Sequence, residues 1–247
     1  REPLSFPKDH GAHPDFRTEW WYLTGYLHAG DAQPAFGFQV TFFRSRVAAT
    51  QDMQSPWAAK HLVFAHAAVT DIRGQKLWHD QRIARSSGVN AQALSIDMAT
   101  FSTDTTSVRL KNWSLQRSNE RIQAQVEAQD FSMKLRCTVA QPLLLQGDQG
   151  LSRKGPQAAQ SSFYYSQPQL SVEGEVELQK VRHAVTAPSK AWLDHEWSNE
   201  LLHPQAVGWD WIGINLFDGA ALTAFRLRTK EGTALWDGGS FRIGTQR

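Results

Sequence analysis

The feature that most constrains the fold of this chain is the absence of helical periodicity. No segment of about ten or more residues repeats its apolar positions with a period of about 3.6. Apolar and polar residues instead alternate in short runs such as 36–43, and turns rich in glycine, proline and aspartate separate these runs, for example at 30–34 and 218–219. The sequence therefore predicts an all-β protein of antiparallel strands, arranged as a sandwich or a barrel.

Length and charge exclude several classes of protein. The 247 residues are enough for one large β domain or two smaller ones, and a Thr-Ala-Pro-Ser stretch resembles a linker, so we predict domains at 1–187 and 188–247. The net charge of +2 comes from scattered Lys and Arg, which argues against a nucleic-acid partner. No stretch approaches the roughly 18 apolar residues of a membrane-spanning helix. The single cysteine, Cys137, excludes an internal disulfide.

Three short segments hold most of the ten tryptophans, and they also carry acids or a histidine. These segments are Glu19–Gly25, Ala191–Trp197 and Gly208–Gly213. Successive side chains of an extended strand point to opposite faces, so both faces of the first segment are aromatic. This pattern is typical of a strand that is covered on both sides, or of one that borders a cavity.

The same segments resemble a known family. The run Phe6–Pro14 followed by Arg17–Gly25 resembles the lipocalin-like family of bacterial carotenoid 1,2-hydratases (hydroxyneurosporene synthases) and AttH proteins, and Trp192–Trp197 and Trp209–Gly213 match its two later motifs in the same order. The resemblance covers almost the whole chain. It implies two lipocalin-like antiparallel β domains, a sandwich-like N-terminal one and a barrel-like C-terminal one that is incomplete here.

The resemblance also implies a function. It points to binding of an apolar lipid or isoprenoid ligand in a lipocalin-like cavity, with carotenoid 1,2-hydratase-like addition of water to a double bond as one outcome. The alternative is a non-catalytic exported lipid carrier or an envelope-assembly protein of the AttH type, with a membrane-associated partner. Hydratases of the family place a tyrosine and an aspartate on the strand after the Trp-Asp-Trp segment, whereas Leu222–Arg226 holds no acid, which favours the carrier. AttH-type relatives imply a periplasmic or secreted bacterial protein.

Hydration of an alkene requires a proton donor, aromatic faces that stabilise positive charge and a dry apolar pocket. We predict His195 as the acid/base residue with Glu19 or Asp194 as its partner, and Asp210 as a further carboxyl candidate. If residues 192–197 are extended, His195 and Trp197 share the face that lines the cavity, and Asp194 lies on the other. The candidate ligand-binding residues are the aromatic ones: Trp20, Trp21, Tyr22, Trp192, Trp197, Trp209 and Trp211.

A structural explanation of these residues stays open. Buried acids, histidines and tryptophans also form hydrogen-bond networks that only join two β domains. No cofactor is expected. We expect no metal either, because His195 has no second histidine at a ligand spacing and the pair His10 and His13 lies in a predicted loop.

Overall fold

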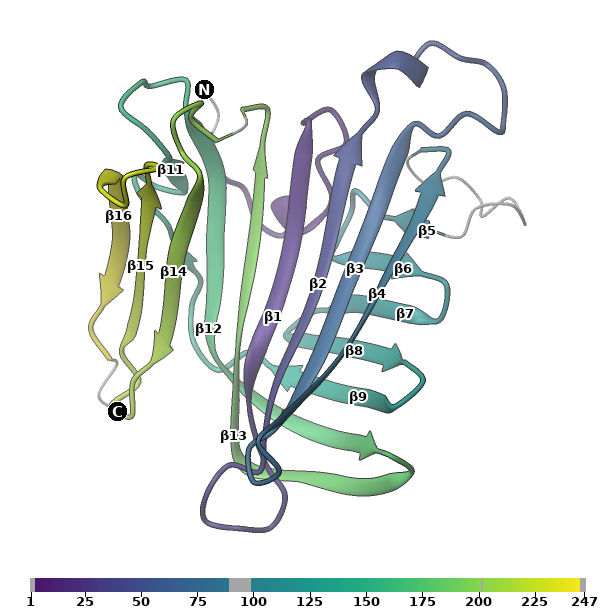
Figure 1. Ribbon diagram of the computed structural model, residues 1–247, viewed down its shortest axis with the longest axis vertical. Coiled ribbons are helices and arrows are strands. Elements are labelled where there is room, and N and C mark those ends of the chain that lie inside the picture. The colour runs from purple at the N-terminus through teal and green to yellow at the C-terminus, as the bar shows by residue number, and fades with distance from the viewer. Residues whose placement is uncertain (1–2, 89–98, 201, 245–247) are drawn as a thin grey trace.

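The computed structural model describes residues 3–88, 99–200 and 202–244, and nearly all of its regular structure is β-strand (Figure 1). Two 3₁₀ turns, Lys8–His10 and Ala48–Thr50, are the only helical elements in these ranges. Within the described residues, sixteen strands form two antiparallel sheets, which confirms the predicted all-β class.

The strands of the large sheet are β1 (Thr18–His28), β2 (Phe36–Arg46), β3 (His61–Asp71), β4 (Lys76–Ser86), β5 (Ala99–Phe101), β6 (Ser107–Leu110), β7 (Trp113–Ser118), β8 (Arg121–Glu127), β9 (Phe131–Thr138), β10 (Leu144–Leu145), β11 (Leu151–Arg153), β12 (Ser161–Leu178) and β13 (Val181–Ser198). The small sheet contains β14 (Gly208–Asn215), β15 (Ala221–Arg228) and β16 (Ala234–Arg242).

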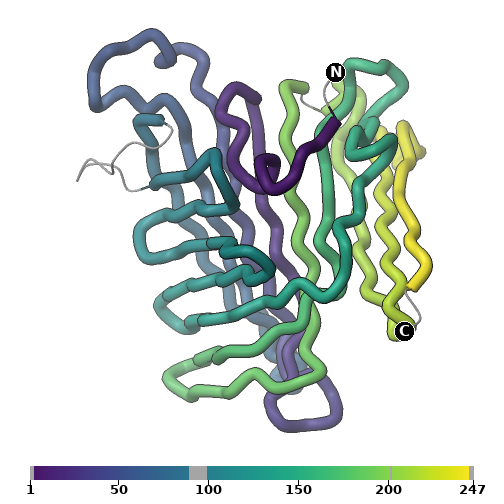
Figure 2. Tube along the Cα trace, turned by 180° about the vertical axis from the view of Figure 1, so that it is seen from behind, coloured from purple at the N-terminus to yellow at the C-terminus, as the bar shows by residue number. Residues whose placement is uncertain are grey.

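The large sheet curls into a nearly closed barrel. Its order is β4-β3-β2-β1-β13-β12-β9-β8-β7-β6-β5, and β10 and β11 pair with β12. Figure 1 shows β5–β9 crossing behind β1–β4, and Figure 2, seen from the other side, shows them in front, so the two halves of the sheet face each other. Fully buried side chains such as Phe42, Trp113 and Leu115 form one apolar core from both halves.

The two longest strands, β12 and β13, link the two halves of the large sheet. They form a hairpin whose turn residues, Gln179 and Lys180, both have positive φ, as a tight hairpin turn requires. The predicted domain division between residues 187 and 188 falls inside β13, which pairs with β12 on both sides of this point. The change from one sheet to the other comes later, between β13 and β14. The division into two domains stays a prediction.

The small sheet lies beside β12, on the outer side of the barrel (Figure 1). A small apolar cluster of Leu144, Trp192 and Ala221, with Trp211 packed on it, joins the two sheets. The Asn215 amide also donates to the Ala191 carbonyl at 3.0 Å. The expectation of a barrel-like sheet together with a second antiparallel sheet is thus confirmed, although the barrel-like sheet is the N-terminal one. Within the described ranges, no helix has the length and hydropathy needed to cross a membrane.

Candidate ligand pocket and buried histidine network

The pairing of β1 with β13 brings the two aromatic motifs together and sorts their side chains onto two faces. Directly opposed residues of an antiparallel pair share a face. Trp20 opposes Glu196 and Tyr22 opposes Asp194 on one face, and Trp21 opposes His195 on the other. The second face points into the barrel core, whereas the first is covered by the small sheet.

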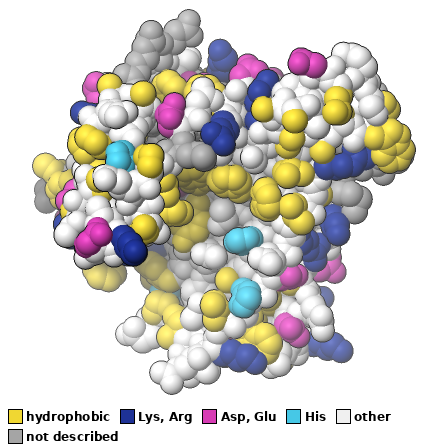
Figure 3. Space-filling view, turned by 45° about the horizontal axis from the view of Figure 1, so that its top comes forward, with side chains coloured by type: hydrophobic (Ala, Val, Ile, Leu, Met, Phe, Trp, Pro, Cys, Tyr) yellow, Lys and Arg dark blue, Asp and Glu magenta, His cyan; other side chains and the backbone are white. Residues whose placement is uncertain are grey.

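A cavity of about 600 Å³ lies between the first face and the small sheet. Figure 3, in which the top of the molecule is tilted forward, shows a hollow bordered by hydrophobic side chains. Strands β1, β2, β12 and β13 form one side of this pocket, and β14 and β15 form the other. It is lined by Thr18, Trp20, Tyr22, Thr41, Phe43, Ser152, Lys154, Tyr164, Asp194, Glu196, Ser198, Glu200, Leu202, Trp209, Trp211, Phe225 and Leu227.

Asp194 is the buried carboxyl of the pocket, with 3% of its surface exposed. Its Oδ1 accepts hydrogen bonds from Ser166 Oγ at 2.5 Å and from Trp192 Nε1 at 2.6 Å. Burial raises the pKa of Asp194 to about 7, against the lowering effect of hydrogen bonds from Ser166, Trp192 and Tyr164. The acid and the carboxylate are therefore both populated near neutral pH. Because Oδ1 already accepts from two donors, the acid form carries its proton on Oδ2.

Hydrogen bonds from surrounding strands hold Asp194 and its neighbours in place. Gln146 Nε2 donates to Ser166 Oγ at 2.8 Å and to Thr223 Oγ1, on β15, at 3.0 Å. Because the Ser166 oxygen accepts this hydrogen bond, the Ser166 hydroxyl can donate its own hydrogen to Asp194. Trp211 Nε1, on β14, donates to Tyr164 Oη at 3.1 Å. The two sheets therefore both take part in orienting the polar groups of the pocket.

Lys154 and Glu196 form a polar patch in the same pocket. The Lys154 ammonium forms an ion pair with the Glu196 carboxylate, which also accepts a hydrogen bond from Ser162. The ammonium also lies 4.5 Å from the centroid of the Trp20 ring. Lys154 is the only Lys or Arg among the described residues that line the pocket.

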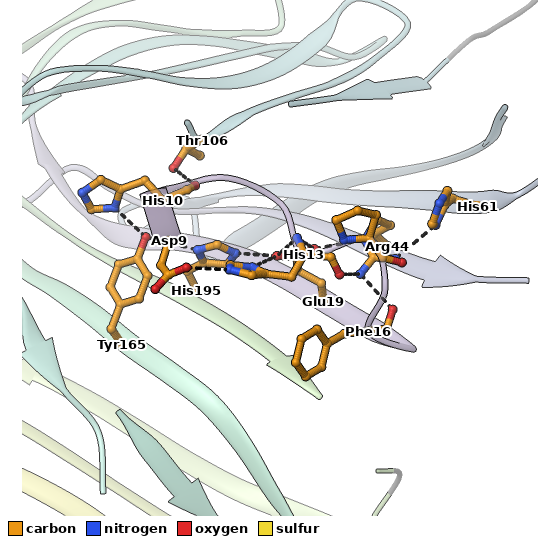
Figure 4. Close-up of polar contacts among 11 residues, drawn as sticks. Asp9, His10, His13, Phe16, Glu19, Arg44, His61, Thr106, Tyr165 and His195 are labelled. Atoms are coloured by element: carbon orange, nitrogen blue, oxygen red, sulfur yellow. Dashed lines mark hydrogen bonds and ion pairs between the residues drawn. The ribbon is translucent and has the colours of Figure 1, made fainter. Parts of the chain in front are cut away.

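The opposite face of β13 holds a buried network around Glu19 (Figure 4). Glu19 Oε1 lies 2.8 Å from His195 Nε2 and 2.9 Å from His13 Nδ1, and Oε2 accepts from Arg44 Nε at 3.0 Å. Burial by itself would raise the pKa of Glu19, but these hydrogen bonds and the Arg44 charge hold it well below its usual range. Burial lowers the pKa of His195, and Glu19 opposes that effect.

The network ties the segment before β1 to the barrel. Tyr165 Oη lies 3.1 Å from His195 Nδ1 and 2.8 Å from His10 Nδ1. Burial lowers the pKa of His10 to about 3, so the ring is neutral at physiological pH. The His13 ring stacks on Trp197 with 3.7 Å between centroids. Ligand atoms of His13, Glu19 and His195 lie within 4.8 Å of one another, but hydrogen bonds and the Arg44 ion pair already satisfy the Glu19 carboxylate.

The structure separates the predicted site residues into groups. Trp20, Tyr22, Trp209, Trp211 and Asp194 line the pocket. The prediction that His195 and Trp197 line the cavity while Asp194 faces away is wrong, because the first two point into the barrel core. Glu19 and Trp21 lie in that core too, and a catalytic role for His195 and Glu19 stays a prediction. Trp192 is buried and donates to Asp194.

Asp210 lies apart from the pocket. Its side chain is 62% exposed and forms an ion pair with Arg228 at 2.7 Å, and Asp210 does not line the pocket. Sequence reasoning had missed Tyr164, Ser166, Gln146 and Lys154. The aromatic run Phe163–Tyr165 was a signal for the first of these. The others are ordinary polar residues whose role arises only from long-range pairing.

The fold and the pocket define a lipocalin-like all-β protein with an aromatic-lined cavity outside its main barrel. The profile of the AttH-like family matches residues 1–247, and the chain belongs to this family. No curated protein sequence matches the chain significantly.

The solved structures that are similar to this chain include two that match nearly all of it. One, from Nitrosomonas europaea and provisionally designated AttH, is 44% identical, has a TM-score of 0.86, and is matched over 98% of this chain and 70% of its own. The other is kievitone hydratase from Nectria haematococca, at 12% identity and a TM-score of 0.69, matched over 98% of this chain and 65% of its own. At that identity, the second likeness shows a shared fold alone.

Proposed function

We propose that this protein binds an apolar small molecule of the lipid or isoprenoid class in the pocket between the two sheets, and that it adds water to a double bond of that molecule. The observation that supports the proposal most directly is a buried carboxyl, Asp194, with a pKa of about 7 among the aromatic residues of a 600 Å³ cavity. An apolar chain would replace water against Trp20, Tyr22 and Trp211. The similarity of the fold to kievitone hydratase is consistent with this reaction class.

In the proposed reaction, Asp194 transfers the proton on Oδ2 to one carbon of the double bond. A water molecule adds its oxygen to the other carbon and gives a proton to the same carboxylate, which restores the acid. Aromatic faces of the pocket stabilise the positive charge that develops between these steps. Ser166 and Trp192 hold Oδ1 throughout, because both are fixed donors to that atom.

The test compares Asp194→Asn with wild type. A panel of isoprenoid alkenes is incubated in ¹⁸O-labelled water, and incorporation of labelled oxygen is followed by mass spectrometry. Ligand binding is measured in parallel by tryptophan fluorescence. We expect the variant to bind the same alkenes and to lose label incorporation by at least about a hundredfold, as removal of a general acid does. Asp210→Asn, an exposed acid outside the pocket, is the matched control. Label incorporation that persists in Asp194→Asn would contradict the proposed mechanism.

The second candidate function is an exported lipid carrier or an envelope-assembly protein without catalysis. It is favoured by the absence of an acid from Leu222–Arg226, the segment that forms most of β15. A carrier would bind the alkenes and release them unchanged in both wild type and Asp194→Asn. For both candidates we propose a periplasmic or secreted location, supported by the family resemblance, and cell fractionation in the source bacterium tests it.

A further inference from the structure

Acidic side chains outnumber basic side chains among the described residues that line the pocket. Three carboxyl side chains, Asp194, Glu196 and Glu200, line it with one ammonium group, that of Lys154. Because Lys154 is already paired with Glu196, it does not offer an uncompensated positive charge. An anionic ligand would therefore meet two further acids without a free cation among the described lining residues.

None of the arginines adjacent in sequence to the lining residues lines the pocket itself: Arg17, Arg44, Arg153, Arg226 and Arg228. Arg44 pairs with Glu19, and Arg226 pairs with Asp237. The Arg153 guanidinium donates to the Gly155 carbonyl at 3.2 Å and lies 4.6 Å from the centroid of the Trp236 ring. Arg228 pairs with Asp210. Neither side chain lines the pocket, so neither compensates its acids.

The aromatic side chains of the pocket complement this charge. The rings of Tyr22 and Trp211 stand nearly perpendicular, with centroids 5.7 Å apart, and Tyr22 is the cross-strand neighbour of Asp194. Trp20 and Phe43 stack in parallel with centroids 5.9 Å apart in the same pocket. Aromatic faces attract ammonium groups and repel carboxylates, and rings grouped beside a carboxyl are a recurrent arrangement for binding alkylated amines.

We propose that the pocket selects apolar ligands with a positively charged group, of the aliphatic amine class, over carboxylates with the same chain. This inference rests on the binding part of the proposed function, because it assumes that the pocket is the ligand site; a bound amine would leave Asp194 without the proton that hydration requires. Asp194 supplies the opposite charge, since an ammonium group beside it favours its carboxylate form. Binding of the amine near neutral pH therefore releases a proton from Asp194.

The test uses three ligands that share a dodecyl chain: N,N-dimethyldodecylamine, dodecanol and dodecanoate. Their affinities for the whole chain are measured at pH 7 by isothermal titration calorimetry, below the concentrations at which they form micelles. We expect the amine to bind at least about tenfold more tightly than dodecanoate, with the alcohol between them. Titrations in buffers with different ionisation enthalpies should show proton release for the amine alone.

Asp194→Asn separates the charge effect from chain binding. In this variant, we expect the preference for the amine over the alcohol to disappear while affinity for the alcohol is unchanged, and Asp210→Asn should behave like wild type. Equal or tighter binding of dodecanoate, or an amine preference that survives in Asp194→Asn, would overturn the inference while alcohol binding still supported the pocket. Failure of all three ligands to bind would overturn both the inference and the proposed binding function.

Discussion

At the scale of single residues, Asp194 and Glu19 show how the same residue class takes opposite properties on two faces of adjacent strands. Burial dominates at Asp194 and raises its pKa to about 7. Hydrogen bonds from His13 and His195 with the charge of Arg44 overcome burial at Glu19 and lower its pKa. The first carboxyl can exchange a proton near neutral pH, whereas the second stays ionised.

Glu19 should therefore be important for stability. Glu19→Gln leaves the fully buried Arg44 without its counter-charge, so we expect the free energy of unfolding to fall by about 3–5 kcal/mol. Denaturant unfolding at pH 7 measures this loss. The control is Glu173→Gln, which removes an exposed ion pair with Arg136 and should cost less than about 1 kcal/mol. Equal effects of the two substitutions would show that the buried network contributes no more than a surface pair.

Asp194 should make the stability of the protein fall as the pH rises. Its pKa is raised on folding from 3.8 to about 7, so the folded state binds the proton more tightly than the unfolded state. Wild type should lose roughly 4 kcal/mol of unfolding free energy relative to Asp194→Asn as the pH rises from about 4 to about 7, and the difference should then level off. Denaturant unfolding of both proteins across this range measures it. A constant difference would mean that the pKa of Asp194 is not raised.

The hydrogen bond from Ser166 lowers the pKa of the Asp194 carboxyl. Ser166→Ala removes a hydrogen bond that favours the charged form, so we expect the pKa of Asp194 to rise further. Carbon NMR titration of labelled aspartate carboxyls measures the shift, with Asp194→Asn used to assign the signal. Ser171→Ala, an exposed position on the same strand, should leave the titration unchanged. A pKa that falls in Ser166→Ala would contradict the arrangement.

At the scale of elements, β13 contributes side chains to both the pocket and the barrel core, because successive side chains of a strand point to opposite faces. Asp194 and Glu196 point to the pocket, and His195 and Trp197 point to the barrel core. The alternation and the hairpin turns at 30–34 and 218–219 could be predicted from the sequence. The turn between β12 and β13 could not, because Gln179 and Lys180 are not residues typical of tight turns. The face of β13 that borders the cavity could not be predicted. An alternating pattern identifies two faces but does not distinguish them, and the choice depends on where the small sheet packs.

The close pairing of β1 with β13 gives a prediction at this scale. A Cβ atom at Gly25 would lie 2.1 Å from the Lys190 carbonyl oxygen of β13, so Gly25→Ala should force the strands apart and cost about 1–3 kcal/mol. Thermal and denaturant unfolding measure the cost. Gly37 on β2 is the matched control, since its nearest contact would be an ordinary 3.5 Å. A Gly25→Ala variant as stable as Gly37→Ala would contradict this register.

At the scale of the whole molecule, the pocket exists only where the two sheets meet. Short-range patterns indicated both sheets, but the contacts that join them link residues far apart in the chain. The hydrogen bond from Gln146 to Thr223 and that from Trp211 to Tyr164 are examples. No spacing in the sequence identifies Gln146 or Tyr164 as partners of these residues. Resemblance to the family indicated the motifs, and the assembled fold assigned each of them to a face.

The measurement that tests the central claim most directly is a crystal structure of the protein soaked or co-crystallised with a long-chain isoprenoid alcohol. We expect ligand density between the two sheets, in contact with Trp20, Tyr22 and Trp211, with its hydroxyl directed toward Asp194. Density in another groove, such as the one lined by Tyr26 and Phe217, with an empty space between the sheets, would contradict the claim.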